Sequence, residues 1–262
     1  MDRNKLLDRA HGDEDRLLLA KILDRQSQSQ RKSIPVCTDF LSPHERALAE
    51  DVLRAAEISP ETHVASGGYG GAERQAILFL PDWQAPETAE FPFRYLRASY
   101  HPEYGLSHRD FLGSLMGLGI VREKVGDLLV GERSCDLIVA DSVAEFLLRD
   151  WTQAGRAPLK VTAVSAEDLN VPEIRCEEVR DTVQSLRLDA VAATGFRMPR
   201  GRAAELIEGG HVEVNWRDCV KPDHLLAAGD TVSARGFGKF KLEQVGGTTR
   251  KGRTGIVLKR YV

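Results

Sequence analysis

Two adjacent glycines, Gly209 and Gly210, divide a stretch in which the spacing of apolar residues changes. Before them, Ala203, Leu206 and Ile207 recur at the i, i+3, i+4 spacing of an amphipathic helix. After them, HVEVNW alternates apolar and polar residues as a half-buried strand does. Glycine often stands just past a helix end because it adopts left-handed backbone angles without strain. The stretch therefore predicts a short helix followed directly by a strand, in a small unit that combines helices with a sheet.

The start of this predicted helix is rich in arginine. Arg197, Arg200 and Arg202 fall within six residues, around Pro199, which can preset the first turn. A helix N-terminus already carries about half a positive charge, so stability alone would favour acidic residues there. The arrangement is favourable if an anion, most simply a phosphate, binds at this end. Surface arginines that extend into water would give the same pattern, so the rest of the chain has to distinguish the two interpretations.

Charge is divided unevenly along the 262 residues. Residues 187–262 hold 14 Lys and Arg against 8 Asp and Glu, whereas residues 1–186 hold 22 against 31. A basic C-terminal part on an acidic body points to a polyanionic partner, and nucleic acid is the first candidate. A membrane surface is a weaker alternative because the cations are interleaved with strand and turn residues. The acidic residues 1–186 are the part expected to meet a protein partner.

The sequence shows no signal for a membrane, a metal or a cofactor. No apolar run approaches the roughly 20 residues of a membrane span, and the N-terminus lacks a signal-peptide core. We therefore expect a soluble, cytoplasmic protein. The seven histidines, His11 among them, fall in no metal-ligand spacing, and no CxxC pair occurs. The scattered cysteines, which we expect to be reduced packing residues, are Cys37, Cys135, Cys176 and Cys219.

The order of helix and strand signals predicts an α+β protein with three domains. We expect a helical N-terminal domain over residues 1–74, in which Ser42, Pro43 and Glu45 form a helix start with a capping box. A central α+β domain over residues 75–168 begins with the strand AILFL and forms an RRM-like or ferredoxin-like layer. The middle of the acidic stretch around Pro172 is the expected connection to a C-terminal domain over residues 181–262.

The C-terminal residues resemble a known RNA-binding domain. RLDAVAATGF, PRGRAAELIEGGHVEVN and AAGDTVSARG occur in the order typical of the S-four-type, or alpha-L, domain of ribosomal proteins. The resemblance implies that the two-helix face contacts RNA backbone, with Arg187 and Arg200 at the principal contact positions and Arg202 beside them. Charge and proximity in the chain suggest the other candidates. The predicted RNA-binding residues are Arg187, Arg197, Arg200, Arg202, Lys221, Arg235, Lys239 and Lys241.

The resemblance extends over most of the chain. TDFLSP, GGYGGAER, GLGIVREKVGDLLV and RGFGKFKL followed by TRKGR are similar to motifs of the bacterial YlmH family, and TDFLSP resembles its cyanobacterial branch, sometimes labelled as photosystem II proteins with an S-four domain. Trp216 stands where other domains of this type carry glycine, but Asn-Trp also occurs in this family. The resemblance implies an rRNA- or tRNA-binding protein of the large ribosomal subunit, with a role in ribosome-associated quality control of stalled nascent chains.

Alternative functions remain open at this stage. RLD also occurs in the catalytic motif of pseudouridine synthases, where the aspartate is the nucleophile, so an RNA-modifying enzyme is one alternative. The single RLD here belongs to the predicted RNA-binding domain, and Asp189 is more simply a helix cap or an ion-pair partner. We therefore predict no catalytic residues and no enzyme activity. An adaptor in cell division or photosystem maintenance is the other alternative.

Two further segments have both a structural and a ligand-binding interpretation. SGGYGGAER lacks the Gly-Lys-Ser/Thr ending of a phosphate loop, and Glu73 stands where the last glycine of GxGxxG would be. It is better explained as a tight turn, although ligand binding stays open. FRYLRASY could stack RNA bases on an aromatic strand. Phe93 and Tyr95 would point to the face opposite Tyr100, so ordinary core packing is the simpler expectation.

Overall fold

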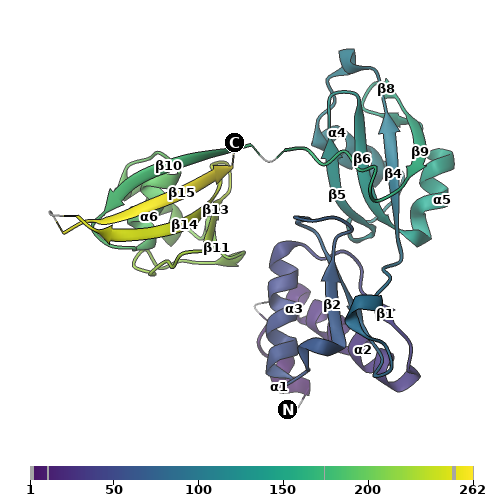
Figure 1. Ribbon diagram of the computed structural model, residues 1–262, viewed down its shortest axis with the longest axis horizontal. Coiled ribbons are helices and arrows are strands. Elements are labelled where there is room, and N and C mark those ends of the chain that lie inside the picture. The colour runs from purple at the N-terminus through teal and green to yellow at the C-terminus, as the bar shows by residue number, and fades with distance from the viewer. Residues whose placement is uncertain (1–2, 11, 174, 250–251, 262) are drawn as a thin grey trace. The chain divides into compact units, whose positions relative to one another are not determined.

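The computed structural model describes residues 3–10, 12–173, 175–249 and 252–261. His11 and two residues of the TRKGR motif, Arg250 and Lys251, lie outside the described residues. The chain divides into two compact units, Met1–Pro172 and Glu173–Val262 (Figure 1). Helices and sheets occur in both units, and the fold is α+β as predicted.

The first part of the Met1–Pro172 unit packs helices on a small sheet. Helices α1 (Arg3–Leu7), α2 (Asp13–Lys32) and α3 (Pro43–Ala55) share a core with the three-stranded sheet β1-β3-β2. The strands are β1 (Val36–Cys37), β2 (His63–Ser66) and β3 (Ala76–Phe79). The predicted capping box of α3 is confirmed, because the Glu45 N–H donates to Ser42 Oγ at 3.2 Å and the Ser42 N–H donates to Glu45 Oε2 at 2.6 Å.

Strand β3 lies in a different sheet from the one we expected. We expected AILFL to open the central layer, but β3 pairs with β1 and β2 in the N-terminal part. All four residues of β3 are buried, which fits the continuous apolar run. Such a run predicts a buried strand without indicating its partner, because pairing depends on residues distant in the chain.

The second part of this unit is the predicted RRM-like or ferredoxin-like layer. Its elements are β4 (Phe93–Ser99), α4 (His108–Gly117), β5 (Val125–Val130), β6 (Ser134–Ala140), α5 (Asp141–Asp150) and β9 (Lys160–Val164). The antiparallel sheet has the order β5-β6-β4-β9, and a hairpin of β7 (Gln153–Ala154) and β8 (Ala157–Pro158) follows α5. Helices α4 and α5 pack on one face around Leu96, Phe111, Leu137, Leu147 and Trp151.

The opposite face of the central sheet is covered by other parts of the same unit. Phe40 stacks on Phe93, with ring centroids 4.6 Å apart, and Tyr95 and Ile138 belong to the same cluster. The backbone of Gly68 lies so close to the sheet that a Cβ atom there would come 2.9 Å from Cε1 of Tyr95. The TDFLSP and SGGYGGAER segments therefore occupy the face on which RRM domains bind RNA.

The Glu173–Val262 unit is a six-stranded sheet with two helices on one face. The order is β10-β15-β14-β13-β11-β12, and all pairs are antiparallel. Figure 1 shows α6 behind the labelled strands, and residues of both helices complete the core. The elements are β10 (Cys176–Val183), α6 (Leu188–Gly195), α7 (Arg200–Glu208), β11 (Val212–Val214), β12 (Arg217–Asp218), β13 (Thr231–Ala234), β14 (Gly238–Thr248) and β15 (Thr254–Tyr261).

Strand β10 was not expected from the sequence. It lies in the acidic stretch that we treated as a connection, yet it pairs with β15 along its whole length. Val183 is buried and Val179 packs against the same core, whereas several other residues of β10 are charged and exposed. Charged side chains are typical of edge strands, where they discourage pairing with other chains, and they conceal the strand pattern.

The predicted change from helix to strand at the glycine pair is confirmed. Helix α7 ends at Glu208, and Gly210 beyond it has φ +71°. The N–H groups of Gly210 and His211 donate to the carbonyls of Ile207 and Leu206, both at 3.0 Å. Strand β11 follows directly. Asn215 and Trp216, at φ +51° and +60°, then form the two-residue turn to β12. Left-handed angles at both positions are typical of a type I′ hairpin turn.

Candidate nucleic-acid interface

Two arginines converge on one buried carboxylate where the helices of the C-terminal unit meet. Arg187, directly before α6, donates from Nε and Nη2 to Asp189 at 3.3 and 3.2 Å. Arg200, the first residue of α7, donates from Nη2 to both oxygens of the same carboxylate at 3.0 and 2.9 Å. Asp189 is 5% exposed, whereas the side chains of Arg187 and Arg200 are 37% and 50% exposed. We call these three residues the arginine cluster.

The arginine cluster keeps a net positive charge. Burial alone would raise the pKa of the Asp189 carboxyl, but hydrogen bonds from Arg187 and Arg200 and their charges hold that pKa below its ordinary value. Asp189 is therefore ionised at neutral pH and neutralises one of the two guanidinium charges. It is an ion-pair partner rather than a helix cap, because no side chain caps α6. Guanidinium N–H groups that do not bond Asp189 remain available to a ligand.

The N-terminal ends of the two helices differ. The first N–H groups of α6 are occupied, because Leu188 donates to the His224 carbonyl at 2.7 Å and Asp189 to the Pro222 carbonyl at 3.1 Å. Helix α7 begins without a side-chain cap and has no acidic residue in its first turn. The start of α7, beside Arg200, is therefore the end at which a phosphate would meet helix N–H groups and the macrodipole.

Four of the predicted cations lie on this helical face. Arg202 is in the first turn of α7 and pairs with Glu205 at 2.9 Å, a surface pair that water and an incoming phosphate can replace. The loop that caps α6 carries the exposed Lys221, whose carbonyl accepts from the His224 N–H. Together with the arginine cluster, Arg202 and Lys221 make the candidate interface.

The other four predicted cations lie elsewhere on the same unit. Arg197 pairs with Glu177 of β10, which also pairs with Arg260 at 3.1 Å. Lys239 and Lys241 alternate with buried residues of β14, so they point to the face opposite the helices. There Lys239 Nζ lies 4.9 Å from the Tyr261 ring centroid, and Lys241 pairs with Glu243. Exposed Arg235 lies in the turn between β13 and β14.

The glycine-rich segment of the Met1–Pro172 unit is held by protein contacts. The Asp127 carboxylate accepts hydrogen bonds from the Tyr69 hydroxyl at 2.9 Å and from the N–H groups of Glu73 and Arg74 at 2.7 and 3.1 Å. The Arg74 side chain donates to the carbonyls of Phe40 and Val125. The backbone donors at the end of SGGYGGAER therefore bind Asp127, which favours the structural interpretation of this turn over a phosphate loop.

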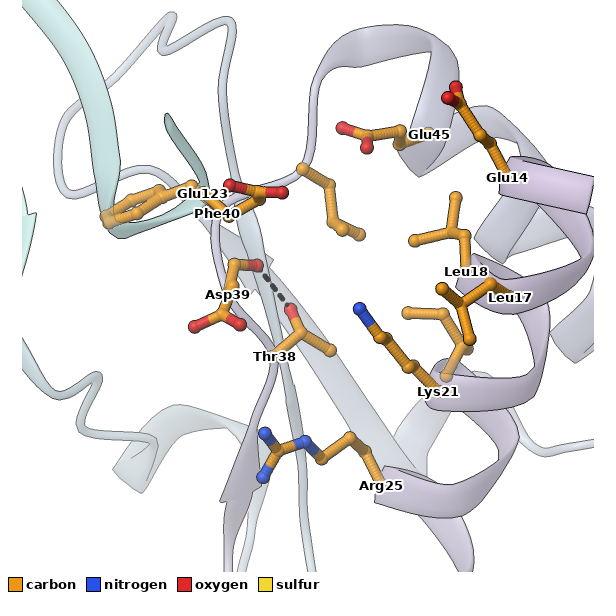
Figure 2. Close-up of a pocket in the computed structure, with 12 residues that line it drawn as sticks. Glu14, Leu17, Leu18, Lys21, Arg25, Thr38, Asp39, Phe40, Glu45 and Glu123 are labelled. Atoms are coloured by element: carbon orange, nitrogen blue, oxygen red, sulfur yellow. Dashed lines mark hydrogen bonds between the residues drawn. The ribbon is translucent and has the colours of Figure 1, made fainter. Parts of the chain in front are cut away.

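Two adjoining cavities lie where these motifs meet. One, of about 500 Å³, is lined by Arg74 and Arg122, and burial lowers the pKa of Arg122 to about 10. The other, of about 620 Å³, lies between α2 and the TDFLSP segment. Figure 2 shows Lys21 and Arg25 reaching from α2 toward the segment that carries Thr38 and Asp39. Carboxylates line both cavities, so neither has the uniform positive charge expected of an RNA site. The carboxylates that line the two cavities belong to Glu14, Asp15, Asp39, Glu45 and Glu123.

The aromatic strand β4 offers no exposed stacking surface of the RRM type. Phe93 and Tyr95 pack in the cluster that covers the sheet, while Tyr100 packs on the helix face, tilted against Phe111 at 5.5 Å. Arg97 forms two hydrogen bonds to Asp136, which is fully buried. Core packing therefore explains FRYLRASY, and the expected division of its aromatic residues between two faces is confirmed.

No group of three or more His, Cys, Asp or Glu residues in the described part of the chain could hold a metal ion. None of the helices that the structure describes combines the length and the apolar character needed to cross a membrane.

Models of known protein families match most of the chain. Residues 14–82 match the family model "YlmH, N-terminal", residues 86–168 match "Putative RNA-binding domain in YlmH", and residues 186–232 match "S4 domain". Over 224 residues the chain is 36% identical to the "Ribosome-associated protein quality control protein P2" of Bacillus subtilis, covering 85% of this chain and 86% of that protein.

A solved structure supports the fold. The "Cell division protein ylmH" of Streptococcus pneumoniae superposes with a TM-score of 0.53 at 20% identity, over 62% of this chain and 98% of that one. At this identity the likeness concerns the fold alone.

Proposed function

This chain belongs to the YlmH family, and on that basis we propose that it is a non-enzymatic RNA-binding protein that contacts rRNA or tRNA on the large ribosomal subunit in the cytoplasm. The name of the Bacillus subtilis relative, a ribosome-associated quality control protein, supports a role in the same process. We further propose that residues 181–262 hold the RNA-binding residues, and that the acidic residues 1–186 meet a protein partner.

The observation that carries the proposal is the geometry of the arginine cluster. The Asp189 carboxylate holds Arg187 and Arg200 in fixed positions at the surface beside the uncapped start of α7. Fixed guanidinium groups bind phosphate oxygens through charge-assisted, often bidentate hydrogen bonds, and little conformational entropy is lost on binding. Phosphate contacts orient a protein on RNA without identifying bases, which suits an anchor on a folded RNA surface.

The pseudouridine synthase alternative is not supported by the environment of Asp189. A nucleophilic aspartate must reach the base that it attacks, whereas this carboxylate is 5% exposed and bonded to two arginines. We therefore propose a structural role for Asp189, which orients the two phosphate-binding side chains.

The proposal is tested by sedimentation of tagged full-length protein with ribosomal subunits in a sucrose gradient. We expect the wild type to migrate with the large subunit, and puromycin, which releases nascent chains, to reduce that fraction. Arg187→Ala and Arg200→Ala should each shift the protein toward the top of the gradient while the protein stays folded, because the remaining arginine still pairs with Asp189. Arg180→Ala is the matched control, since Arg180 is 78% exposed on edge strand β10. Wild-type sedimentation of both cluster variants would contradict the proposal.

A further inference from the structure

The turn between β13 and β14 exposes a phenylalanine. Ala234 pairs with Gly238, and the loop between them contains Arg235, Gly236 and Phe237. The Phe237 N–H donates to the Ala234 carbonyl at 3.0 Å, and the two glycines have φ of +84° and +87°, which close the turn tightly. Phe237 is nevertheless 45% exposed. The backbone of this turn is well defined, yet it leaves a large apolar ring in water.

The Phe237 ring is supported from the core. Its centroid lies 6.3 Å from that of Phe196, at the C-terminal end of α6, with an angle of 53° between the rings. Phe196 in turn packs edge-on against Phe240 at 5.0 Å, and Phe240 is fully buried. This chain of aromatic contacts limits the motion of the exposed ring, so that a flat ligand would lose little entropy by stacking on it.

Cations stand on both sides of the ring in the sequence. Arg235 precedes Phe237 by two residues and is exposed in the same turn, and Lys239 follows it by two residues, at the start of β14. Aromatic rings flanked by cations are typical of proteins that bind single-stranded nucleic acid, because the ring stacks on a base while the cations contact the backbone.

We propose that Phe237 is a stacking platform for an unpaired RNA base. The inference rests on the proposed function. It adds that the bound RNA contains an unpaired base, because a fully paired duplex offers no free base to stack. Helix α6 connects the platform to the arginine cluster, because Arg187 precedes its first residue and Phe196 follows its last. Its eight residues span about 12 Å. At about 3.4 Å per stacked nucleotide, the cluster and the platform can bind one RNA strand a few nucleotides apart.

The test compares two RNAs of equal length and charge, one a blunt duplex and one a stem with an unpaired loop, bound to the full-length protein. Phe237→Ala and Phe237→Leu should each weaken binding of the loop RNA about tenfold and leave duplex binding unchanged. Phe237→Tyr should retain wild-type affinity because it keeps the ring. The leucine variant keeps an apolar side chain in the turn, so a loss shared by both variants at an unchanged melting temperature identifies the ring itself.

Two controls separate this inference from the proposed function. Trp83→Ala removes an aromatic side chain that is 68% exposed on the other unit and should change neither affinity. Arg200→Ala should weaken binding of both RNAs and reduce the salt dependence, whereas the Phe237 variants should leave the salt dependence intact because stacking releases no counterions. Unchanged affinity of the Phe237 variants, or an equal loss for both RNAs, would overturn the platform alone. Failure of the wild type to bind either RNA would overturn the proposed function as well.

Discussion

At the scale of residues, the Asp189 carboxylate positions two guanidinium groups at the surface of the C-terminal unit. Without it, Arg187 and Arg200 would be long, flexible side chains that lose entropy whenever they bind a phosphate. Burial of the ionised carboxylate is unfavourable, and the hydrogen bonds and charges of the two arginines offset this cost. The same interactions therefore stabilise the fold and position the proposed RNA-binding side chains.

Asp189→Asn tests this coupling through pH. Because the folded-state pKa of Asp189 is lowered, its stabilisation should be complete above about pH 4 and should be lost as pH falls through that lowered pKa. We expect the variant to lose about 1–2 kcal/mol of unfolding free energy at pH 7, since the arginines are partly exposed. The difference from wild type in urea unfolding should shrink at pH 3. Glu178→Gln, at an exposed carboxylate of β10, should show neither effect, and a pH-independent difference for Asp189→Asn would contradict this account.

The residues of the arginine cluster could be predicted from the sequence, but their convergence on one carboxylate could not. The S-four-type motif singled out Arg187 and Arg200, and RLD placed an acidic residue two positions after the first arginine. Charge and chain proximity also selected Lys239 and Lys241, which the alternation of β14 turns to the opposite face. That alternation was visible in GKFKL, where buried Phe240 and Leu242 separate the lysines, and it could have divided the list.

At the scale of elements, a glycine-rich turn packs on one face of the central sheet and helps to cover it. The SGGYGGAER segment lies against β4 and β6, and its backbone is bonded to Asp127 at the edge of the same layer. This close packing requires a glycine at position 68. Gly68 has φ +90°, and its backbone lies against Tyr95 and Ile138.

Gly68→Ala should therefore destabilise the Met1–Pro172 unit. The left-handed backbone alone costs an alanine about 1–2 kcal/mol, and the added Cβ would also displace the Tyr95 ring. Gly70→Ala is the matched control in the same turn, since a Cβ there would meet no atom within 4 Å. Chemical denaturation of residues 1–172 measures both variants. Equal unfolding free energies for the two would show that the turn does not pack on the sheet as described.

Local signals predicted these elements better than their partners. The capping box predicted the start of α3 and the glycine pair predicted the end of α7, because those signals act within a few residues. The partners of β3 and β10 could not be predicted in the same way. One strand is apolar on both faces and the other is largely charged, so neither shows an alternation that would indicate which sheet it joins.

At the scale of the whole molecule, charge and fold divide at nearly the same place. Residues 173–262 hold 16 Lys and Arg against 12 Asp and Glu, whereas residues 1–172 hold 20 against 27. The C-terminal unit has its own core, and β10 belongs to it, so the expected start of the domain at residue 181 would remove residues 176–180 from the sheet.

A fragment of residues 173–262 should accordingly fold and bind RNA, whereas residues 1–172 should not bind it. A fragment of residues 181–262 should bind more weakly because its sheet loses most of an edge strand that packs on the core through Val179 and Val183. Filter binding at fixed salt, with circular dichroism to confirm folding, measures all three fragments. RNA binding by folded residues 1–172 at the affinity of the whole chain would place the RNA site in the other unit.

The salt dependence of RNA binding tests whether the helical face acts as a backbone anchor. If Arg187, Arg200, Arg202 and Lys221 each neutralise one phosphate of a short duplex, log K should fall with log salt at a slope of about −3 to −3.5, because each contact releases about 0.7–0.9 of a counterion. Arg200→Ala should reduce the slope by nearly one unit, whereas Arg197→Ala should reduce it less, because Arg197 is already paired with Glu177. Duplexes of different sequence should bind alike, since phosphate contacts carry no base identity. A shallow slope combined with strong preference for one sequence would show that this protein identifies bases directly, and the arginine cluster would then not be the main source of affinity.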